Sequence, residues 1–240
     1  MLQELYSQRE QKIVVVLPAY NCARTLSRTF SEIPLNVVDD VVLVDDCSTD
    51  TTCLVAQKLG IKHIYRHQNN TGYGGNQKTC YDIALGLNAD IVIMLHPDYQ
   101  YDPKLIPQMI SCVDSGADVV LASRFLLGFE ALRLGMPLYK FCANRFLTYF
   151  QNVLLRTRLS EYHTGYRLFT RQVLESICYH SFSDDFIFDN EILVSAIRRG
   201  YKIDEIYCPA RYLSDSSSIG FFSAVKYGLL VLKNTLRRCR

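Results

Sequence analysis

Residues 13–21 read IVVVLPAYN, a run of apolar and β-branched residues that ends in proline and polar side chains. A short continuous apolar run of this kind is typical of a buried strand. Four similar runs follow, at residues 41–44, 61–65, 91–95 and 119–122. Segments with helical spacing separate them, at residues 23–33, 51–59, 80–87 and 102–113. Strands that alternate with helices of this length predict an α/β fold with a mainly parallel central sheet flanked by helices.

Polar clusters follow three of these predicted strands, at residues 18–21, 45–50 and 96–100. In open parallel sheets, ligands bind at the carboxyl ends of the strands. Because all three clusters fall at such ends, we expect them to form one ligand site.

The composition excludes several classes of protein. A formal charge of +2 over 240 residues argues against nucleic-acid binding, which usually needs a strongly basic domain. The nine cysteines form no CxxC pair, so we expect free thiols in a reducing, cytoplasmic compartment and no structural zinc. No apolar run reaches about 18 residues and no apolar stretch follows a basic start, so neither a transmembrane helix nor a secretory signal is expected.

The segment His96–Gln100 (HPDYQ) contains metal-binding side chains at alternate positions. If the chain stays extended here, His96, Asp98 and Gln100 point to the same side and converge on one divalent cation. Magnesium is usually held by one or two protein carboxylates, and an imidazole shifts the preference toward manganese. The alternative is a polar turn between strand and helix.

The other two polar segments also have two interpretations each. In residues 45–50 (DDCSTD), Asp46 faces a base or ribose, or Ser48 and Asp50 simply cap the next helix. In residues 69–75 (NNTGYGG), backbone amides around Gly72 cradle a phosphate with Lys78 one turn further on, or the glycines form only a tight turn.

Taken together and in order, residues 14–21, 44–50, 70–74 and 96–100 resemble glycosyltransferase family 2, in its dolichol-phosphate mannose synthase-like branch. The resemblance implies a GT-A fold and a Mg²⁺- or Mn²⁺-dependent, inverting transfer of a hexose. The implied donor is a UDP- or GDP-sugar, and the implied acceptor is a polyprenyl phosphate or a glycan.

The resemblance also assigns residues. Pro18, Tyr20 and Asp46 would contact the nucleoside, with Asn21 beside them. Asp98 and Gln100 match the latter part of the family's D-x-D-x-Q metal motif. Arg124 matches an arginine that faces the donor or acceptor phosphate, and residues 163–167 (HTGYR) resemble an acceptor-side segment.

Position 96 departs from the family pattern, because His96 stands where the first aspartate of the motif is usual. A histidine remains a competent ligand for a first-row metal, which favours an active enzyme. The alternative is a catalytically weak or degenerate nucleotide-sugar-binding protein. A sugar-1-phosphate nucleotidyltransferase is a further alternative, but that class usually has a glycine-rich loop after its first strand.

The acceptor decides whether a general base is needed. A lipid phosphate is already an anion, whereas a hydroxyl must lose its proton. Among the acidic residues of 183–191, Asp189 is our candidate base. The alternative is an acidic helix start that interacts with the helix dipole.

We therefore divide the chain into four parts. Residues 1–12 are a flexible lead-in, 13–125 the nucleotide-sugar-binding half, and 126–218 the acceptor-side half of the same domain. Residues 219–240 form a basic amphipathic helix with Lys226, Lys233 and Arg237 on one stripe. Such a helix, like the aromatic-rich segment 138–155, fits either the surface of a membrane or packing on the sheet. We expect a peripheral protein at the cytoplasmic membrane face.

Overall fold

The computed structural model describes residues 10–209, 211 and 221–236. Its centre is a seven-stranded sheet with the order β3-β2-β1-β4-β6-β5-β7. The strands are β1 (Ile13–Ala19), β2 (Asp40–Asp45), β3 (His63–Arg66), β4 (Ile91–Met94), β5 (Val119–Ser123), β6 (Arg167–Thr170) and β7 (Ile203–Tyr207). Only β6 is antiparallel to its neighbours, and it lies between β4 and β5. The mainly parallel α/β sheet is confirmed.

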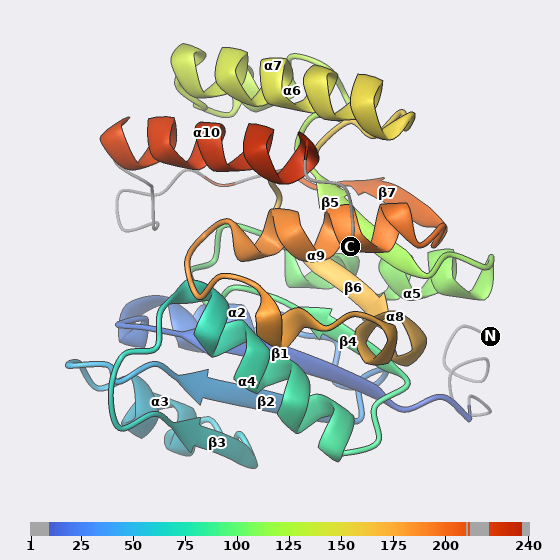
Figure 1. Ribbon diagram of the computed structural model, residues 1–240. Helices are drawn as coiled ribbons and strands as arrows, with labels where there is room; N and C mark the ends of the chain where they lie inside the picture. The colour runs from blue at the N-terminus through green and yellow to red at the C-terminus, as the bar shows by residue number, and fades with distance from the viewer. Residues whose placement is uncertain (1–9, 210, 212–220, 237–240) are drawn as a thin grey trace.

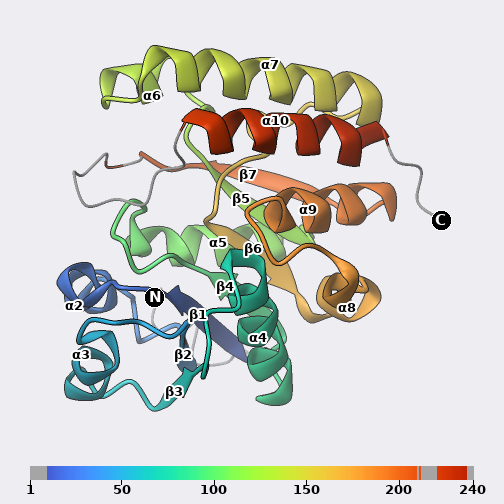
Figure 2. The ribbon, with the colours of Figure 1, turned by 60° about the vertical axis from the view of Figure 1, so that its left-hand side comes forward.

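Helices cover both faces of this sheet (Figures 1 and 2). The helices that lie close to it are α2 (Ala23–Ser31), α3 (Thr52–Lys58), α4 (Tyr73–Gly86), α5 (Ile106–Asp114), α8 (Arg171–Ser176) and α9 (Phe188–Arg198). Further from it lie α6 (Glu130–Arg133), α7 (Leu138–Leu155) and α10 (Phe221–Leu236). Two single 3₁₀ turns, η1 (Pro103–Leu105) and η2 (Tyr179–Ser181), complete the list.

The alternation of side chains along β1 produces two hydrophobic cores. Val15 and Leu17 pack with α2, α3 and α5 on one face, whereas Val14 and Val16 pack with α4, α8 and α9 on the other. All four side chains are fully buried. A strand buried on both faces needs apolar residues at every position, which explains the continuous run in the sequence.

Several element boundaries differ from the predictions. The helix expected over residues 80–87 begins already at Tyr73, and the strand expected over 61–65 is His63–Arg66. The first helix ends at Ser31 rather than at residue 33. The helix expected from residue 102 begins as the 3₁₀ turn η1, whose first free amide, the Lys104 N–H, donates to the Asp102 carboxylate at 3.1 Å. The α-helical part then starts at Ile106.

Helices α7 and α10 lie side by side and form a layer above α9 (Figures 1 and 2). Buried polar side chains connect the three helices. Gln151 of α7 exchanges hydrogen bonds with Asn190 of α9 and donates to Thr235 of α10 at 3.1 Å. The predicted C-terminal helix is therefore present over 221–236, and it packs on the rest of the protein along one side.

Some expectations fall at the ends of the chain. Most of the predicted lead-in (residues 1–12), together with Arg237 and the end of the basic C-terminal segment, lies outside the described residues. Lys12 is described, and its backbone N–H donates to Asp90 at 2.7 Å. Among the described residues, no helix combines the length and hydropathy needed to cross a bilayer. The division of the domain at residue 125 stays a prediction, although strands from both parts share one sheet.

Candidate active site

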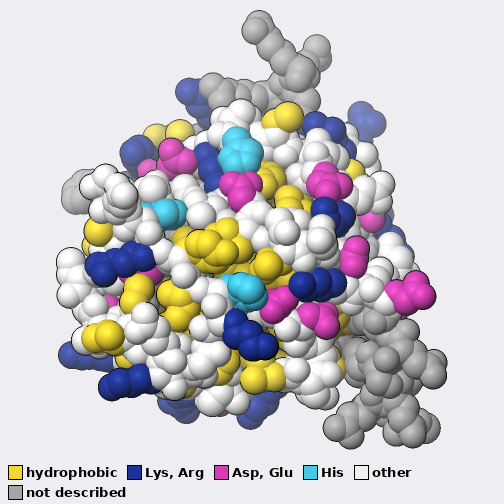
Figure 3. All heavy atoms as spheres, turned by 90° about the horizontal axis from the view of Figure 1, so that it is seen from below, with side chains coloured by type: hydrophobic (Ala, Val, Ile, Leu, Met, Phe, Trp, Pro, Cys, Tyr) yellow, Lys and Arg dark blue, Asp and Glu magenta, His cyan; other side chains and the backbone are white. Residues whose placement is uncertain are grey.

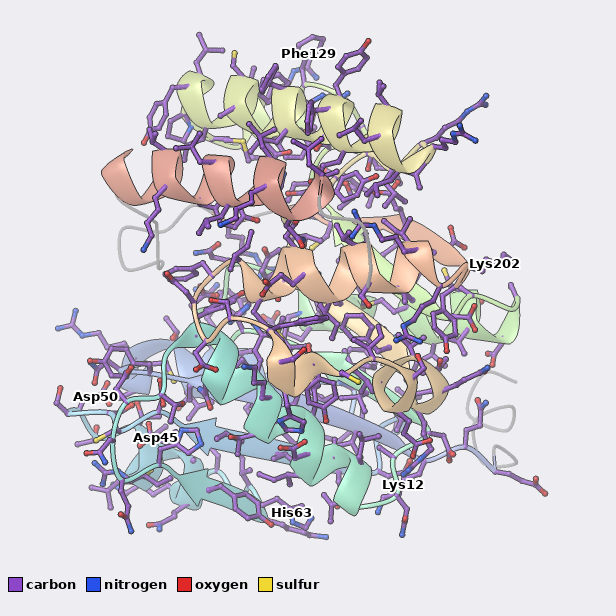
Figure 4. All side chains as sticks on the ribbon, in the orientation of Figure 1. Lys12, Asp45, Asp50, His63, Phe129 and Lys202 are labelled. Atoms are coloured by element: carbon purple, nitrogen blue, oxygen red, sulfur yellow. The ribbon has the colours of Figure 1, made fainter. Side chains whose placement is uncertain are left out.

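The carboxyl ends of β1, β2 and β4 meet at one edge of the sheet, because the three strands are parallel. Figure 4 shows Asp45 and Asp50 together at this end of the sheet, with Lys12 at the opposite end. Two groups of polar side chains lie along the edge. We define the β2 cluster as Asn21, Asp45, Asp46, Ser48 and Thr71. The β4 cluster comprises the hydrogen-bonded side chains of Tyr73, His96 and Asp189, together with Asp98 and Gln100, which follow His96 along the chain.

The members of the β2 cluster bond mainly to the loops around them. The side-chain oxygen of Asn21 accepts hydrogen bonds from the backbone N–H groups of Thr49 at 2.8 Å and Asp50 at 3.3 Å. Asp45 is fully buried and pairs with Arg66 at 3.2 Å. Asn21, which we predict near the nucleotide, therefore also holds the turn after β2.

Asp46 is only 3% exposed, and both of its carboxylate oxygens are occupied. Oδ1 accepts from the backbone N–H and the hydroxyl of Thr71, each at 2.8 Å, and lies 2.9 Å from Nδ1 of His67. Oδ2 accepts from the backbone N–H of Gly72 at 3.1 Å. Asp46 thus anchors the glycine-rich turn, and its contact with a nucleoside stays a prediction.

The glycine-rich turn is covered by the backbone of residues 183–184. The N–H of Gly74 donates to the carbonyl oxygen of Asp184 at 2.7 Å, so this amide does not face an open phosphate site. A Cβ on Gly72 would lie 2.6 Å from that same oxygen, and one on Gly74 would lie 2.5 Å from the carbonyl oxygen of Ser183. Close approach of two backbones accounts for these glycines.

Lys78, expected beside a phosphate, turns toward the same covering segment. Its ammonium group donates to the carbonyl oxygen of Phe182 at 2.6 Å and to the Asp184 carboxylate at 2.7 Å. The side chain is 8% exposed. In this arrangement Lys78 fastens residues 182–184 to α4, and its role toward a donor stays a prediction.

The segment after β4 is not extended, which corrects the geometry expected for the metal ligands. Residues 97–99 form a turn, and Tyr99 has a positive φ of 61°. Asp98 Oδ1 accepts from the backbone N–H of Gln100 at 3.1 Å, as in a turn closed by an aspartate. Side-chain alternation therefore does not carry through this segment, and the turn interpretation is correct for the backbone.

His96 is the first member of a chain of hydrogen bonds that continues through Tyr73 to Asp189. Its Nε2 lies 2.9 Å from the hydroxyl of Tyr73, and that hydroxyl donates to Oδ2 of Asp189 at 2.6 Å. The imidazole also stacks on the Tyr73 ring, with centroids 5.3 Å apart. Burial, followed by the charge of Asp189, raises the pKa of Tyr73 well above its ordinary value, so the phenol keeps its proton.

Three side chains of the β4 cluster fit a divalent cation by their chemistry. Asp98 supplies a carboxylate, Gln100 an amide oxygen and His96 a ring nitrogen, a set that suits a cation completed by phosphate oxygens and water. Nδ1 of His96 has no hydrogen bond to any described residue. The described residues contain no group of three or more histidines, cysteines and acids that would hold a metal by themselves.

Arg124 follows β5 and is held by Glu161, which is fully buried. The Glu161 carboxylate accepts from the backbone N–H and the Nε–H of Arg124, each at 2.9 Å. The Arg124 side chain remains 13% exposed. A buried ion pair of this kind fixes the guanidinium in one orientation.

His163 lies next to this pair and connects it to α10. Its Nδ1 is 2.8 Å from the hydroxyl of Tyr227. Burial, together with the charges of Arg124 and Arg167, lowers the pKa of His163 to about 3. The imidazole is therefore neutral at physiological pH.

Pro18 lies near the end of β1, and Tyr20 directly follows the strand. Pro18 is buried and pairs with Val44 in the sheet, whereas Tyr20 is 54% exposed at the edge. Of the two, only Tyr20 has its ring at the surface, and its contact with a base stays a prediction.

Three residues of the site had no role of their own in the sequence prediction. Tyr73 and Glu161 have the contacts described above, and Gly165 lies against His96, since a Cβ there would lie 2.7 Å from Nε2. Tyr73 belongs to the glycine-rich segment 69–75 and Gly165 to the predicted acceptor-side segment 163–167, whereas Glu161 lies in neither. Asp189, the partner of Tyr73, lies 116 residues further along the chain, so no local pattern links them.

The described residues on one face of the molecule show no large patch of a single charge. Figure 3 shows the face that carries β3, α3 and α4, where basic and acidic side chains are interspersed with histidines and apolar patches. A nucleic-acid-binding surface would show a field of one sign.

The mainly parallel sheet, flanked by helices and with polar side chains at its carboxyl edge, has the architecture of the GT-A fold. The sequence model of Glycosyl transferase family 2 matches residues 14–178, so this chain belongs to that family.

Curated relatives agree with the family. An uncharacterised protein of Methanocaldococcus jannaschii is 28% identical over 88% of this chain and 86% of its own length. Polyprenol monophosphomannose synthase of Mycolicibacterium smegmatis is 23% identical over 82% of this chain and 76% of its own. Dolichol-phosphate mannosyltransferase of Pyrococcus furiosus is 30% identical, over 49% of this chain and 34% of its own. The resemblance to the dolichol-phosphate mannose synthase-like branch is thereby confirmed.

Solved structures confirm the fold. Glucosyl-3-phosphoglycerate synthase from Mycobacterium tuberculosis, crystallised with Mn²⁺, UDP and phosphoglyceric acid, has a TM-score of 0.71. The comparison covers 98% of this chain and 80% of that one at 18% identity.

Proposed function

We propose that this enzyme transfers a hexose, with inversion, from a UDP- or GDP-sugar to a polyprenyl phosphate, and that it needs Mg²⁺ or Mn²⁺. The observation that carries the proposal is the β4 cluster. Asp98, Gln100 and Nδ1 of His96, which has no hydrogen-bond partner among the described residues, follow one strand at the ligand edge of the sheet. The names of the curated relatives support the lipid phosphate, and the solved relative with UDP and Mn²⁺ supports the donor and the metal.

In this proposal, the protein first orients the donor. Tyr20 stacks on the base beside Pro18 and Asn21, while His96, Asp98 and Gln100 hold the cation against the diphosphate. A bound divalent cation stabilises the negative charge that builds on the departing nucleoside diphosphate. Arg124, held by Glu161, adds a fixed positive charge for the donor or acceptor phosphate.

The transfer then needs an aligned nucleophile. A phosphate oxygen of the acceptor forms a bond to the anomeric carbon on the face opposite the leaving group. The bond to the diphosphate breaks, and its electron pair leaves with the diphosphate. An attack on that face inverts the anomeric configuration. No general base is required, because the acceptor is already an anion.

A glycan acceptor is the second candidate, because Asp189 lies within the same cluster. A hydroxyl acceptor would need a base, and Asp189 is the acid of that region that we predict for the role. Its exposure of 6% and its hydrogen bond from Tyr73 make it a poor base as it stands. We therefore favour the lipid phosphate.

A lipid acceptor requires access to a membrane, and we propose that α7 and α10 provide it from the cytoplasmic face. Both helices expose large apolar side chains: Leu138 (65%), Phe146 (61%) and Tyr149 (71%) on α7, and Val225 (50%) and Leu229 (64%) on α10. The Lys226 side chain, 72% exposed, and Lys233 add positive charge suited to anionic headgroups. Figure 4 shows Phe129, 70% exposed, on the same outer layer.

Calorimetry with UDP-glucose and GDP-mannose, each with and without MnCl₂, tests the donor and the metal. We expect one nucleotide-sugar to bind only with metal. Incubation of that donor with a polyprenyl phosphate should then give a lipid-linked sugar with inverted configuration. If no nucleotide-sugar binds with metal, the proposal is wrong. If binding occurs without transfer to any acceptor, the protein is a degenerate binding protein instead.

A further inference from the structure

The hydrogen bonds around Tyr73 have a fixed direction. A phenol has one proton to donate, and it is protonated at neutral pH. A carboxylate only accepts, so the contact of 2.6 Å between the Tyr73 hydroxyl and Asp189 uses that proton. The Tyr73 oxygen is then left to accept a hydrogen bond from His96, 2.9 Å away. His96 must therefore carry its proton on Nε2.

The surroundings of Asp189 favour this hydrogen bond from Tyr73. Its other oxygen, Oδ1, is buried and has no donor within the described part of the chain. Arg167, fully buried, donates to the carbonyl oxygen of Asp189 and places positive charge beside it. If Tyr73 turned its proton toward His96, the buried carboxylate would lose the one hydrogen-bond donor that it has among the described residues, which is costly.

The imidazole ring is also held in position. It stacks on the Tyr73 ring, and its Cδ2–Nε2 edge faces Gly165, where a Cβ would lie 2.7 Å from both atoms. Nδ1 is the ring atom opposite that bond, so it points away from Gly165. Any side chain at position 165 would push the ring out of place.

We propose that Asp189 and Tyr73 are positioning residues that fix His96 as its Nε2–H tautomer and reserve the Nδ1 lone pair for the divalent cation. The metal part of this proposal rests on the proposed function. A ring nitrogen that binds a metal commonly has its tautomer set by a hydrogen bond at the other nitrogen. Here a phenol relays that effect from the carboxylate. The relay explains how a histidine serves at this position of the motif.

Nuclear magnetic resonance of the full chain without metal or nucleotide tests the relay directly. With the His96 signals assigned by a His96→Gln variant, long-range proton–nitrogen correlation should show a protected proton on Nε2. Tyr73→Phe should make that proton exchange rapidly with water. The matched control is Tyr81→Phe, which removes another tyrosine hydroxyl of α4, one that bonds to Gln77 at 3.2 Å. In this control the His96 signal should not change.

Asp189→Asn supplies a second test with a near-isosteric side chain. An amide can donate to the Tyr73 oxygen and so release the phenol proton toward His96. We therefore expect a new population of His96 with its proton on Nδ1. Titration of MnCl₂ in the presence of UDP, followed by the paramagnetic resonance of free Mn²⁺, should show about ten-fold weaker metal binding in both variants, because the lone pair is no longer held for the cation.

The outcomes separate the two proposals. A wild-type His96 with its proton on Nδ1, or an Nε2–H signal that survives Tyr73→Phe unchanged, would overturn the relay whatever the protein binds. A wild-type protein that shows the relay but binds no Mn²⁺ with any nucleotide would refute the proposed function and the metal role of His96 together.

Discussion

The β2 cluster and the β4 cluster lie at the same edge of one sheet, yet they use their polar atoms differently. In the β2 cluster, Asp45 accepts from the backbone N–H of Ser48 and pairs with Arg66. Asp46 accepts from the backbone N–H groups of Thr71 and Gly72. In the β4 cluster, Nδ1 of His96 and Oδ1 of Asp189 have no partner among the described residues. Buried polar groups are nearly always paired in folded proteins. We infer that the β2 cluster is part of the scaffold, and we expect a ligand beside His96 and Asp189 of the β4 cluster.

The strongest test of this difference is Asp98→Ala. If the β4 cluster holds the cation, metal-dependent binding of the donor should disappear and kcat/KM should fall by roughly a thousand-fold or more, because the charge of the leaving group is no longer stabilised. The fold should stay intact, since Asp98 is only half-buried and lies in a turn after β4. Asp102→Ala, a nearby carboxylate that caps η1, is the control and should keep donor binding. Unaltered donor affinity in Asp98→Ala would mean that the site is misplaced.

Asp46→Asn tests the other cluster, where the loss should appear in stability. We expect the free energy of unfolding to fall by about 2–4 kcal/mol, because an amide group would then face backbone donors in a buried site. Urea unfolding followed by circular dichroism measures this change. Asp50→Asn should cost less than about 1 kcal/mol, since Asp50 is exposed and an asparagine still accepts from Thr52. Equal losses in the two variants would remove the distinction between scaffold and surface carboxylates.

The contact between the glycine-rich turn and residues 183–184 can be tested with two glycines of one helix. Gly74→Ala places a Cβ 2.5 Å from the Ser183 carbonyl oxygen, and we expect a loss of about 1–3 kcal/mol because a backbone must move. Gly86→Ala meets nothing within 4 Å and should gain up to about 1 kcal/mol from better helix propensity. Thermal unfolding of both variants decides the matter, and a stable Gly74→Ala protein would show that the turn is open.

The smallest effect concerns His163 and pH. Its pKa is lowered to about 3 in the folded protein, from an ordinary value of about 6.5, by burial and by Arg124 and Arg167. At low pH the unfolded chain therefore binds a proton at this histidine that the folded chain does not. The free energy of unfolding consequently falls as the pH drops from about 6.5 toward 3. Between pH 7 and 5.5, His163→Gln should reduce the pH dependence of the unfolding free energy by about 1 kcal/mol. An unchanged slope in chemical denaturation would show that His163 is protonated in the fold.

The strands of the fold could be predicted from the sequence where a strand consists of one continuous apolar run. Strands β1, β2, β4 and β5 are continuous apolar runs because helices cover both of their faces. Strand β6 was missed because it is four residues long, begins with a buried arginine and has no such run. Strand β7 reads Ile-Asp-Glu-Ile-Tyr and also lacks a continuous apolar run. It lies at the edge of the sheet, where charged side chains remain in contact with solvent.

For the site, the sequence predicted which residues lie at the strand ends, but not which groups they contact. The sequence could not show that Asp46 would be taken by Thr71 and Gly72, because those amides come from a loop 25 residues away. Nor could it show that residues 97–99 turn, since Tyr99 is not a residue type that usually adopts a positive φ. These outcomes depend on which loops meet in space.

The antiparallel strand β6 has a consequence for how the chain is made. β6 lies between β4 and β5 and is their only connection across the sheet among the described residues. Until residues 167–170 leave the ribosome, the nascent chain carries two strands with bare edges, and such edges are templates for aggregation. The order of synthesis therefore makes this one short strand the piece that joins β5 to the rest of the sheet, and β7, which is made later, only extends the edge at β5.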